Sequence, residues 1–360
     1  MHRKILVLAN SSSGLYDFRK ELLSELGKKC EIVISVPEYD KVPELEEKGF
    51  EVIVVPMERR GLNPLRDLKL IAAYWKILRK EKPSLVITYT IKPNIYGGFL
   101  CRLLRMPYAV NITGLGTAFR KQGILRKFVT CLYKVSVKNA KVVFFENKEN
   151  QQIFITEKII REQNACLLNG AGVNLEYFTP AEYPKQEKPV RFLFVGRVMR
   201  EKGIDEVFGA MERLYEEGVS VVLDVLGNYE EHYEEEIKEY EGKGWLRYHG
   251  YQRDVRPFIE QAHCFVLPSW HEGMANTNLE CAAMARPIIT SNIHGCKEAV
   301  IEGVSGYLCE KQSVNSLYGA MKQFVKLDNV SKMKMGLQGR KHMESLFDKK
   351  KVVEETIARL

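Results

Sequence analysis

One alternating pattern runs through the chain and constrains its fold more than any other feature. Short runs rich in β-branched and aromatic residues, such as residues 4–9 and 191–197, alternate with longer amphipathic stretches, such as residues 17–29 and 64–81. Apolar runs this short between amphipathic helices indicate parallel sheets with helices on both faces. The predicted fold class is therefore α/β, with doubly wound sheets.

The alternation stops once, in a polar, proline-containing segment at residues 176–190, and then starts again. A chain of 360 residues is also long enough for two domains, each with its own core. The sequence therefore predicts two Rossmann-like domains in tandem, residues 1–175 and 176–345. Ligands of such sheets bind beyond the carboxyl ends of the strands, so functional residues are expected just after strands.

The net charge of +8 is unevenly distributed. Residues 1–170 hold 29 Lys and Arg against 17 Asp and Glu, whereas the remaining residues hold 25 against 29. The basic first half implies an anionic partner, which could be a nucleic acid, an anionic membrane or a phosphorylated substrate.

Eight cysteines include no CxxC pair and no His/Cys cluster with metal-site spacing. This usage predicts a reducing, cytoplasmic environment with buried thiols and no bound metal. No apolar run approaches the roughly 20 residues that span a bilayer. The basic and apolar start of the chain lacks a cleavage site after it, and it is interpreted as a first strand rather than a signal peptide.

A strand that ends at Gly196 is followed by Arg197 and Lys202, just before a helix. Glycine permits close approach of the backbone, and the two cations could neutralise a diphosphate. Ordinary surface cations would explain the same residues equally well. In the first half, the Ser/Gly turn around Gly14 precedes a helix and could bind an anion. It lacks both GxGxxG and GxxxxGK[ST], so a plain tight turn remains open.

The segment 270–284 places Glu272 in a loop after a buried strand and Glu280 in the following helix. The loop amides at the helix start could bind an anion, and the two carboxylates could accept hydrogen bonds from sugar and ribose hydroxyls. Two glutamates eight residues apart are weak evidence by spacing alone.

Residues 119–141 combine cations with apolar residues, as an interfacial helix does. The cations considered for membrane contact are Arg120, Lys121, Arg126 and Lys127. The alternative is a helix whose apolar face joins the domain core.

Together these segments resemble glycosyltransferase family 4, the retaining enzymes of GT-B architecture. The resemblance rests on FVGRVMREKG, LGNYEE, HGYQRDV, the stretch from VLPSWHEG to CKEAV, and GVSGYL. In the first half, YTIKPNIYGG and NITGLG resemble the bacterial subgroup that builds capsule, O-antigen and protein-linked glycans, including N-acetylgalactosaminyltransferases of the PglA type.

The resemblance implies roles for individual residues. Arg197 and Lys202 would bind the donor diphosphate, Glu272 would orient the donor sugar, and Glu280 would hold the ribose. The remaining donor-site residues implied are Gly14, Gly196, Gly273, Met274, Ala275, Asn276 and Thr277. A last helix within residues 346–360 would cross back to the first domain.

The acceptor site is expected around Lys92, Asn94, Thr113 and Gly114. The chain departs from many relatives at Thr113, where they carry a histidine, so no role for a histidine carries over. No DxD triplet occurs, which favours a metal-independent reaction with no cofactor.

The expected activity is retaining transfer of a hexose or N-acetylhexosamine from a UDP-sugar to a saccharide acceptor on polyprenyl diphosphate. The partners expected are this donor, this acceptor and an anionic membrane surface, but no nucleic acid. The protein would then work in the cytoplasm, on the inner face of the cell membrane. The alternatives are a non-hydrolysing UDP-N-acetylhexosamine 2-epimerase, which needs no acceptor, and a non-catalytic membrane scaffold.

Overall fold

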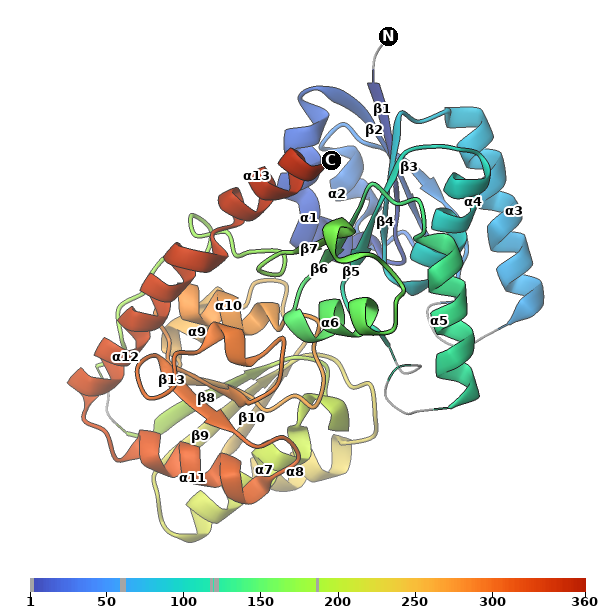
Figure 1. The fold of residues 1–360 in the computed structure, drawn as a ribbon. Helices are drawn as coiled ribbons and strands as arrows, with labels where there is room; N and C mark the ends of the chain where they lie inside the picture. Colours follow the sequence, from blue (N-terminus) through green and yellow to red (C-terminus); the bar gives the residue numbers. More distant parts are fainter. Residues whose placement is uncertain (1–2, 59–62, 117–118, 120–122, 186–187) are drawn as a thin grey trace. The chain divides into compact units, whose positions relative to one another are not determined.

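The computed structural model describes residues 3–58, 63–116, 119, 123–185 and 188–360. The chain divides into two compact units (Figure 1). The first unit contains residues 1–171 and 350–360, and the second contains residues 172–349. The boundary between the units therefore lies four residues before the predicted one.

The first unit is built on a parallel sheet of seven strands in the order β3-β2-β1-β4-β5-β6-β7. The strands are β1 (Arg3–Leu8), β2 (Cys30–Val36), β3 (Glu51–Val54), β4 (Leu85–Tyr89), β5 (Tyr108–Ile112), β6 (Val142–Phe145) and β7 (Ala165–Leu167). The central strands β1, β4, β5 and β6 are almost continuously buried, which is why they read as apolar runs rather than alternating ones.

Helices cover both faces of this sheet. One core lies under α1 (Ser12–Gly27), α2 (Val42–Glu46) and α13 (Lys349–Arg359), where Val353 of the last helix packs with β1 and β2 residues. The opposite core lies under α3 (Pro64–Glu81), η1 (Pro93–Gly97), α4 (Gly98–Leu103), α5 (Ile124–Ser136) and α6 (Lys148–Thr156). The last helix of the chain thus completes the first unit.

The second unit contains a parallel sheet of six strands in the order β10-β9-β8-β11-β12-β13. The strands are β8 (Val190–Val195), β9 (Val221–Leu226), β10 (Leu246–Gly250), β11 (Cys264–Leu267), β12 (Ile288–Ser291) and β13 (Gly306–Cys309). The helices are η4 (Arg200–Lys202), α7 (Ile204–Glu216), α8 (Glu234–Gly242), α9 (Arg256–Gln261), α10 (Asn276–Ala283), η5 (Lys297–Ala299), α11 (Val314–Val325), α12 (Asn329–His342) and η6 (Met343–Phe347). Both sheets follow the Rossmann strand order, so the prediction of two doubly wound parallel sheets is confirmed.

Six of the eight cysteines are buried, and all eight are free thiols. Cys131 on α5 is exposed and Cys30 is half-buried, so burial is the rule but not for every thiol. Among the described residues, no helix combines the length and the apolar character that crossing a membrane requires.

Candidate active site

The order of the second sheet creates one natural site. Strand β8 lies between β9 and β11. The strands that follow β8 in sequence, β9 and β10, lie on one side of it, and β11, β12 and β13 lie on its other side. Such a switch point leaves a crevice beyond the carboxyl ends of the two strands. Gly196 follows β8 and Pro268 follows β11, so the predicted donor-site segments begin at this edge.

Lys202 and Glu272 meet at this switch point. The Lys202 Nζ lies 2.5 Å from Glu272 Oε1, and the Ser269 hydroxyl donates to the same oxygen at 2.8 Å. The two charged side chains are only 21% and 12% exposed, so water screens their attraction less than at an open surface. The structure therefore brings together two of the predicted residues, 70 positions apart in the sequence.

Glycines allow the backbone segments around this pair to pack closely. Gly203 follows Lys202 with a φ of +77°, and a Cβ there would lie 2.3 Å from the carbonyl oxygen of Pro268. Gly295 has a φ of +89°, and a Cβ there would lie 2.7 Å from the Gly273 oxygen. Both positions require a left-handed backbone and empty space together, which only glycine provides without strain.

Trp270 connects the same two segments. Its backbone N–H donates to the Glu201 carbonyl at 2.9 Å, and its indole Nε1 donates to Glu206 Oε1 at 3.2 Å. Glu206 lies in the first turn of α7 and is 6% exposed. Burial raises the pKa of its carboxyl, with the Trp270 hydrogen bond acting in the opposite direction. Because Trp270 is two residues from Glu272, this contact fixes the loop that carries the carboxylate.

Arg197 is the more exposed cation of the predicted pair. Its guanidinium lies 3.2 Å from Glu230, and its side chain is 48% exposed. An ion pair this open to water adds little stability, so an incoming anion could replace it. The Gly196 backbone packs against Gly227, where a Cβ would lie 1.9 Å from the Gly196 oxygen.

The helix α10 begins at Asn276, and it contains Glu280, as predicted. The backbone of Ala275 donates its N–H to the Gly295 carbonyl at 2.7 Å. The Ala275 amide is therefore used within the fold in this structure, and its predicted binding of phosphate stays a prediction. Asn276 and Thr277 form the first turn of the helix, whose N–H groups point along the axis toward its amino end.

Gly14 lies within the first turn of α1 rather than in an open loop. Its N–H donates to the Ser11 side chain at 3.1 Å, which caps the helix. The N–H of Ser12 donates at 2.5 Å to Glu38, which follows β2. A carboxylate of the chain itself therefore lies at the helix start where the sequence suggested an external anion.

The acceptor-site predictions divide into two groups. The ammonium of Lys92 lies 2.8 Å from Asp67, with both side chains about 90% buried, and Asn94 is 1% exposed and donates to the Asn111 carbonyl at 2.8 Å. Lys92 and Asn94 thus have partners inside the unit, and their predicted role in acceptor binding stays a prediction. Thr113 and Gly114 follow β5 and are half-buried, and Gly114 has open space where a Cβ would be.

The predicted membrane residues also have different environments. Arg126 forms an ion pair with Glu157 and is 16% exposed, so it is not the open surface cation that the sequence suggested. Lys127 is exposed on α5, whereas Arg120 and Lys121 lie outside the described residues. Val129 and Tyr133 join the core, but Ile124 is 89% exposed. The helix therefore has both a core face and an exposed apolar face.

Three contacts of the site were missed in the sequence: Ser269, Glu206 and Glu230. Ser269 is three residues before Glu272, and a serine two residues after a buried strand was the available signal. The roles of Glu206 and Glu230 depend on contacts with Trp270 and Arg197, which are 64 and 33 positions away, and no local pattern reveals such contacts.

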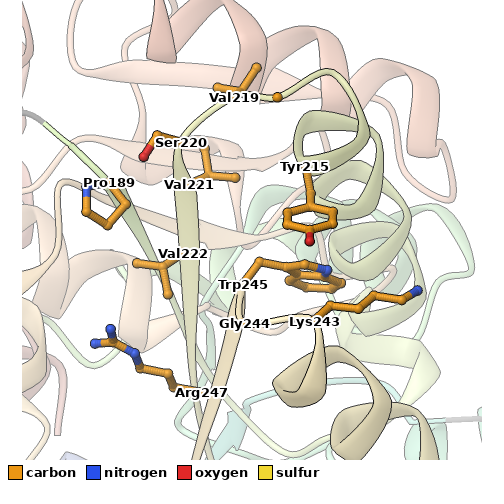
Figure 2. Close-up of a pocket in the computed structure, with 11 residues that line it drawn as sticks. Pro189, Tyr215, Val219, Ser220, Val221, Val222, Lys243, Gly244, Trp245 and Arg247 are labelled. Atoms are coloured by element: carbon orange, nitrogen blue, oxygen red, sulfur yellow. The ribbon is translucent and has the colours of Figure 1, made fainter.

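A surface pocket of about 340 Å³ lies elsewhere in the second unit. Figure 2 shows the rings of Tyr215 and Trp245 on one side and the Arg247 guanidinium near the strands. Its lining residues Pro189 and Val221 are at the starts of β8 and β9, so it lies at the edge of the sheet opposite the switch point. Across the described ranges, no group of three or more His, Cys, Asp or Glu side chains is arranged to hold a metal ion.

Two family models match this chain. Residues 4–147 match the family described as Glycosyl transferase 4-like, and residues 178–342 match Glycosyl transferases group 1. The chain is 26% identical over 332 residues to the N,N'-diacetylbacillosaminyl-diphospho-undecaprenol alpha-1,3-N-acetylgalactosaminyltransferase of Campylobacter jejuni, covering 87% of each protein. It is 27% identical over 288 residues to the UDP-Gal:alpha-D-GlcNAc-diphosphoundecaprenol alpha-1,3-galactosyltransferase of Escherichia coli, covering 74% of this chain and 73% of that protein.

Solved structures show the same fold. Anabaena Alr3699/HepE in complex with UDP and glucose superimposes with a TM-score of 0.81 at 15% identity, covering 100% of both chains. The lipopolysaccharide outer core galactosyltransferase WaaB superimposes with a TM-score of 0.72 at 18% identity, covering 99% and 100%. These matches confirm the GT-B fold, and nothing in them favours the epimerase. The two matched halves and the paired Rossmann-like sheets therefore show that the chain belongs to the family 4 glycosyltransferases.

Proposed function

We propose that this glycosyltransferase moves a hexose or N-acetylhexosamine from a UDP-sugar to a saccharide on polyprenyl diphosphate, with retention at the anomeric carbon. The observation that carries the donor assignment is the Lys202–Glu272 pair at the switch point of the second sheet. The acceptor assignment is supported by the relatives from Campylobacter jejuni and Escherichia coli, whose names specify acceptors on undecaprenyl diphosphate. An acceptor of this kind places the enzyme at the inner face of the cell membrane.

In this proposal the donor changes the partner of Lys202. Without donor, the ammonium is neutralised by Glu272. The diphosphate attracts the ammonium together with the exposed Arg197, and this frees the Glu272 carboxylate to accept hydrogen bonds from sugar hydroxyls. Glu280 holds the ribose. Lys202 thus exchanges one anion for another and keeps its charge compensated throughout.

The transfer then proceeds on one face of the sugar. The bond between C1 and the diphosphate oxygen breaks, and the electron pair leaves with the phosphate. The acceptor hydroxyl forms its bond to C1 on the same face and gives its proton to the departing phosphate oxygen. Lys202 and Arg197 stabilise the negative charge that develops there, and no metal takes part in this scheme.

The donor assignment is tested by comparing cations in one segment. Lys202→Ala should reduce turnover of a UDP-sugar by about 100- to 1,000-fold, the usual loss when a group that stabilises a leaving anion is removed. Arg200→Ala is the matched control, because Arg200 is 68% exposed and pairs with Asp205. UDP release is measured with and without acceptor, and proton NMR of the product determines the anomeric configuration. Equal rates for both variants, or UDP release that needs no acceptor, would contradict the proposal.

A further inference from the structure

The exposed apolar side chains of the protein are concentrated on three helices of the first unit. Among the described residues, nine of 20 exposed large hydrophobic side chains lie on α3, α4 and α5, which together comprise 37 of the 360 residues. We name this surface the apolar helix face. Its nine members are Leu65, Leu68, Trp75, Phe99, Leu103, Ile124, Leu125, Phe128 and Val135.

The three helices are neighbours, so their exposed residues form one surface. Helix α4 contacts both α3 and α5, and Figure 1 shows α4 between them. On α5, Ile124 and Phe128 are four residues apart, as are Phe99 and Leu103 on α4, and residues at this spacing share one side of a helix. The opposite sides of the same helices fill the core through residues such as Tyr74 and Tyr133. The exposed residues are therefore additional to those that fold the unit.

The charge on these helices has one sign at the surface. The helices contain nine Lys and Arg but only two acidic residues, Asp67 and Glu81. Both carboxylates are compensated inside the unit, Asp67 by Lys92 and Glu81 by Lys4, each at 2.8 Å. On α5 and just after it, Lys127, Lys134 and Lys138 are exposed beside the apolar side chains. An apolar surface rimmed by cations is complementary to lipid acyl chains under anionic headgroups.

We propose that the apolar helix face docks the protein onto an anionic lipid bilayer. This inference extends the proposed lipid-linked acceptor by naming the surface through which the enzyme reaches it. A second copy of the chain fits this face less well, because a symmetric contact would oppose the lysines of the two copies. Ile124 and Phe128 enter the interfacial layer, and the three lysines contact anionic headgroups.

The proposal is tested by vesicle sedimentation. The vesicles contain phosphatidylcholine alone or a 70:30 mixture of phosphatidylcholine and phosphatidylglycerol, at low and high salt. At low salt, the full chain should bind the mixed vesicles at least tenfold more strongly than it binds the vesicles of phosphatidylcholine alone. The triple variant Lys127→Gln, Lys134→Gln, Lys138→Gln should lower this partitioning by about 100-fold, since each cation near an anionic membrane contributes about a fivefold increase. The double variant Ile124→Ser, Phe128→Ser should lower partitioning by at least tenfold on both kinds of vesicle.

Matched controls lie on the second unit. Met333→Ser with Leu337→Ser removes two exposed apolar side chains with the same spacing from α12, and Lys326→Gln, Lys334→Gln, Lys341→Gln removes three exposed charges. Both control variants should bind mixed vesicles like the wild type. A solvent-sensitive dye on the exposed Cys131 should shift its emission to shorter wavelength on these vesicles.

Three outcomes would overturn the proposal: wild-type binding that ignores lipid charge, face variants that bind like the wild type, or a wild-type dimer in solution that either face variant converts to monomers. Turnover of a water-soluble acceptor with a short prenyl chain is measured in parallel and should be unchanged in all variants. Loss of turnover with intact vesicle binding would refute the proposed acceptor but not the docking face.

Discussion

Replacing Gly203 with alanine tests the packing that brings Lys202 to Glu272. The backbone at Gly203 is left-handed, with a φ of +77°, and the added Cβ would lie 2.3 Å from the Pro268 oxygen and 2.7 Å from the Pro268 carbonyl carbon. The left-handed conformation costs a non-glycine residue about 1 kcal/mol. The collision adds about 1–3 kcal/mol, as overpacking of a filled site does. Gly203→Ala should therefore destabilise the second unit by about 2–4 kcal/mol.

Gly218 provides a control that separates the two contributions. It follows α7 with a nearly identical φ of +72°, but no atom lies within 4 Å of the position of an added Cβ. Gly218→Ala should therefore cost only about 1 kcal/mol, from the backbone conformation alone. The difference between the two variants isolates the contact between Gly203 and Pro268.

Urea unfolding followed by tryptophan fluorescence measures this difference. In a Trp75→Phe background the remaining tryptophans are Trp245 and Trp270, which both lie in the second unit. The fluorescence transition then reports the unit that carries both glycines. If Gly203→Ala and Gly218→Ala lower the urea midpoint equally, the close packing of the Lys202 segment on the end of β11 is wrong.

Three further predictions concern other parts of the chain. Burial raises the pKa of Glu206 above its ordinary value of 4.5, so the folded chain binds the carboxyl proton more tightly than the unfolded chain does. The protonated carboxyl therefore favours the folded state at low pH, and this contribution to stability falls as the pH rises from the ordinary pKa through the raised one. Glu206→Gln should accordingly gain stability relative to the wild type as the pH rises there, and a pH-independent difference in urea midpoint would contradict this. A maleimide at neutral pH should label the exposed Cys131 within the folded chain, whereas Cys101, whose pKa burial raises to about 12, should be labelled only in urea, as mass spectrometry can establish. Arg126→Ala should lower the stability of the first unit by about 1 kcal/mol, because it leaves the partly buried Glu157 carboxylate without its guanidinium, and unchanged thermal unfolding would exclude that contribution.

The alternation of strand and helix determined the fold class, because buried parallel strands must be apolar along their whole length and their connecting helices must be amphipathic. The position of Glu280 within α10 was also predictable, since a buried strand, a polar loop and a helix follow each other locally. Family motifs then identified the activity and pointed to Lys202 and Glu272. These are features of short segments, which a sequence displays directly.

The tertiary structure decided which charges remain available to a ligand. Lys92 and Arg126 looked like free cations in the sequence, but Asp67 and Glu157 neutralise them from 25 and 31 residues away. In the same way, Glu38 accepts a hydrogen bond from the Ser12 N–H at the start of the helix that contains Gly14. The exposed side of α5 was undetermined for a related reason: periodicity shows that a helix has apolar residues, but only its neighbours in the fold determine which of them are covered. Compensation of charge and burial of apolar surface both depend on contacts distant in sequence, and for that reason they required the folded chain.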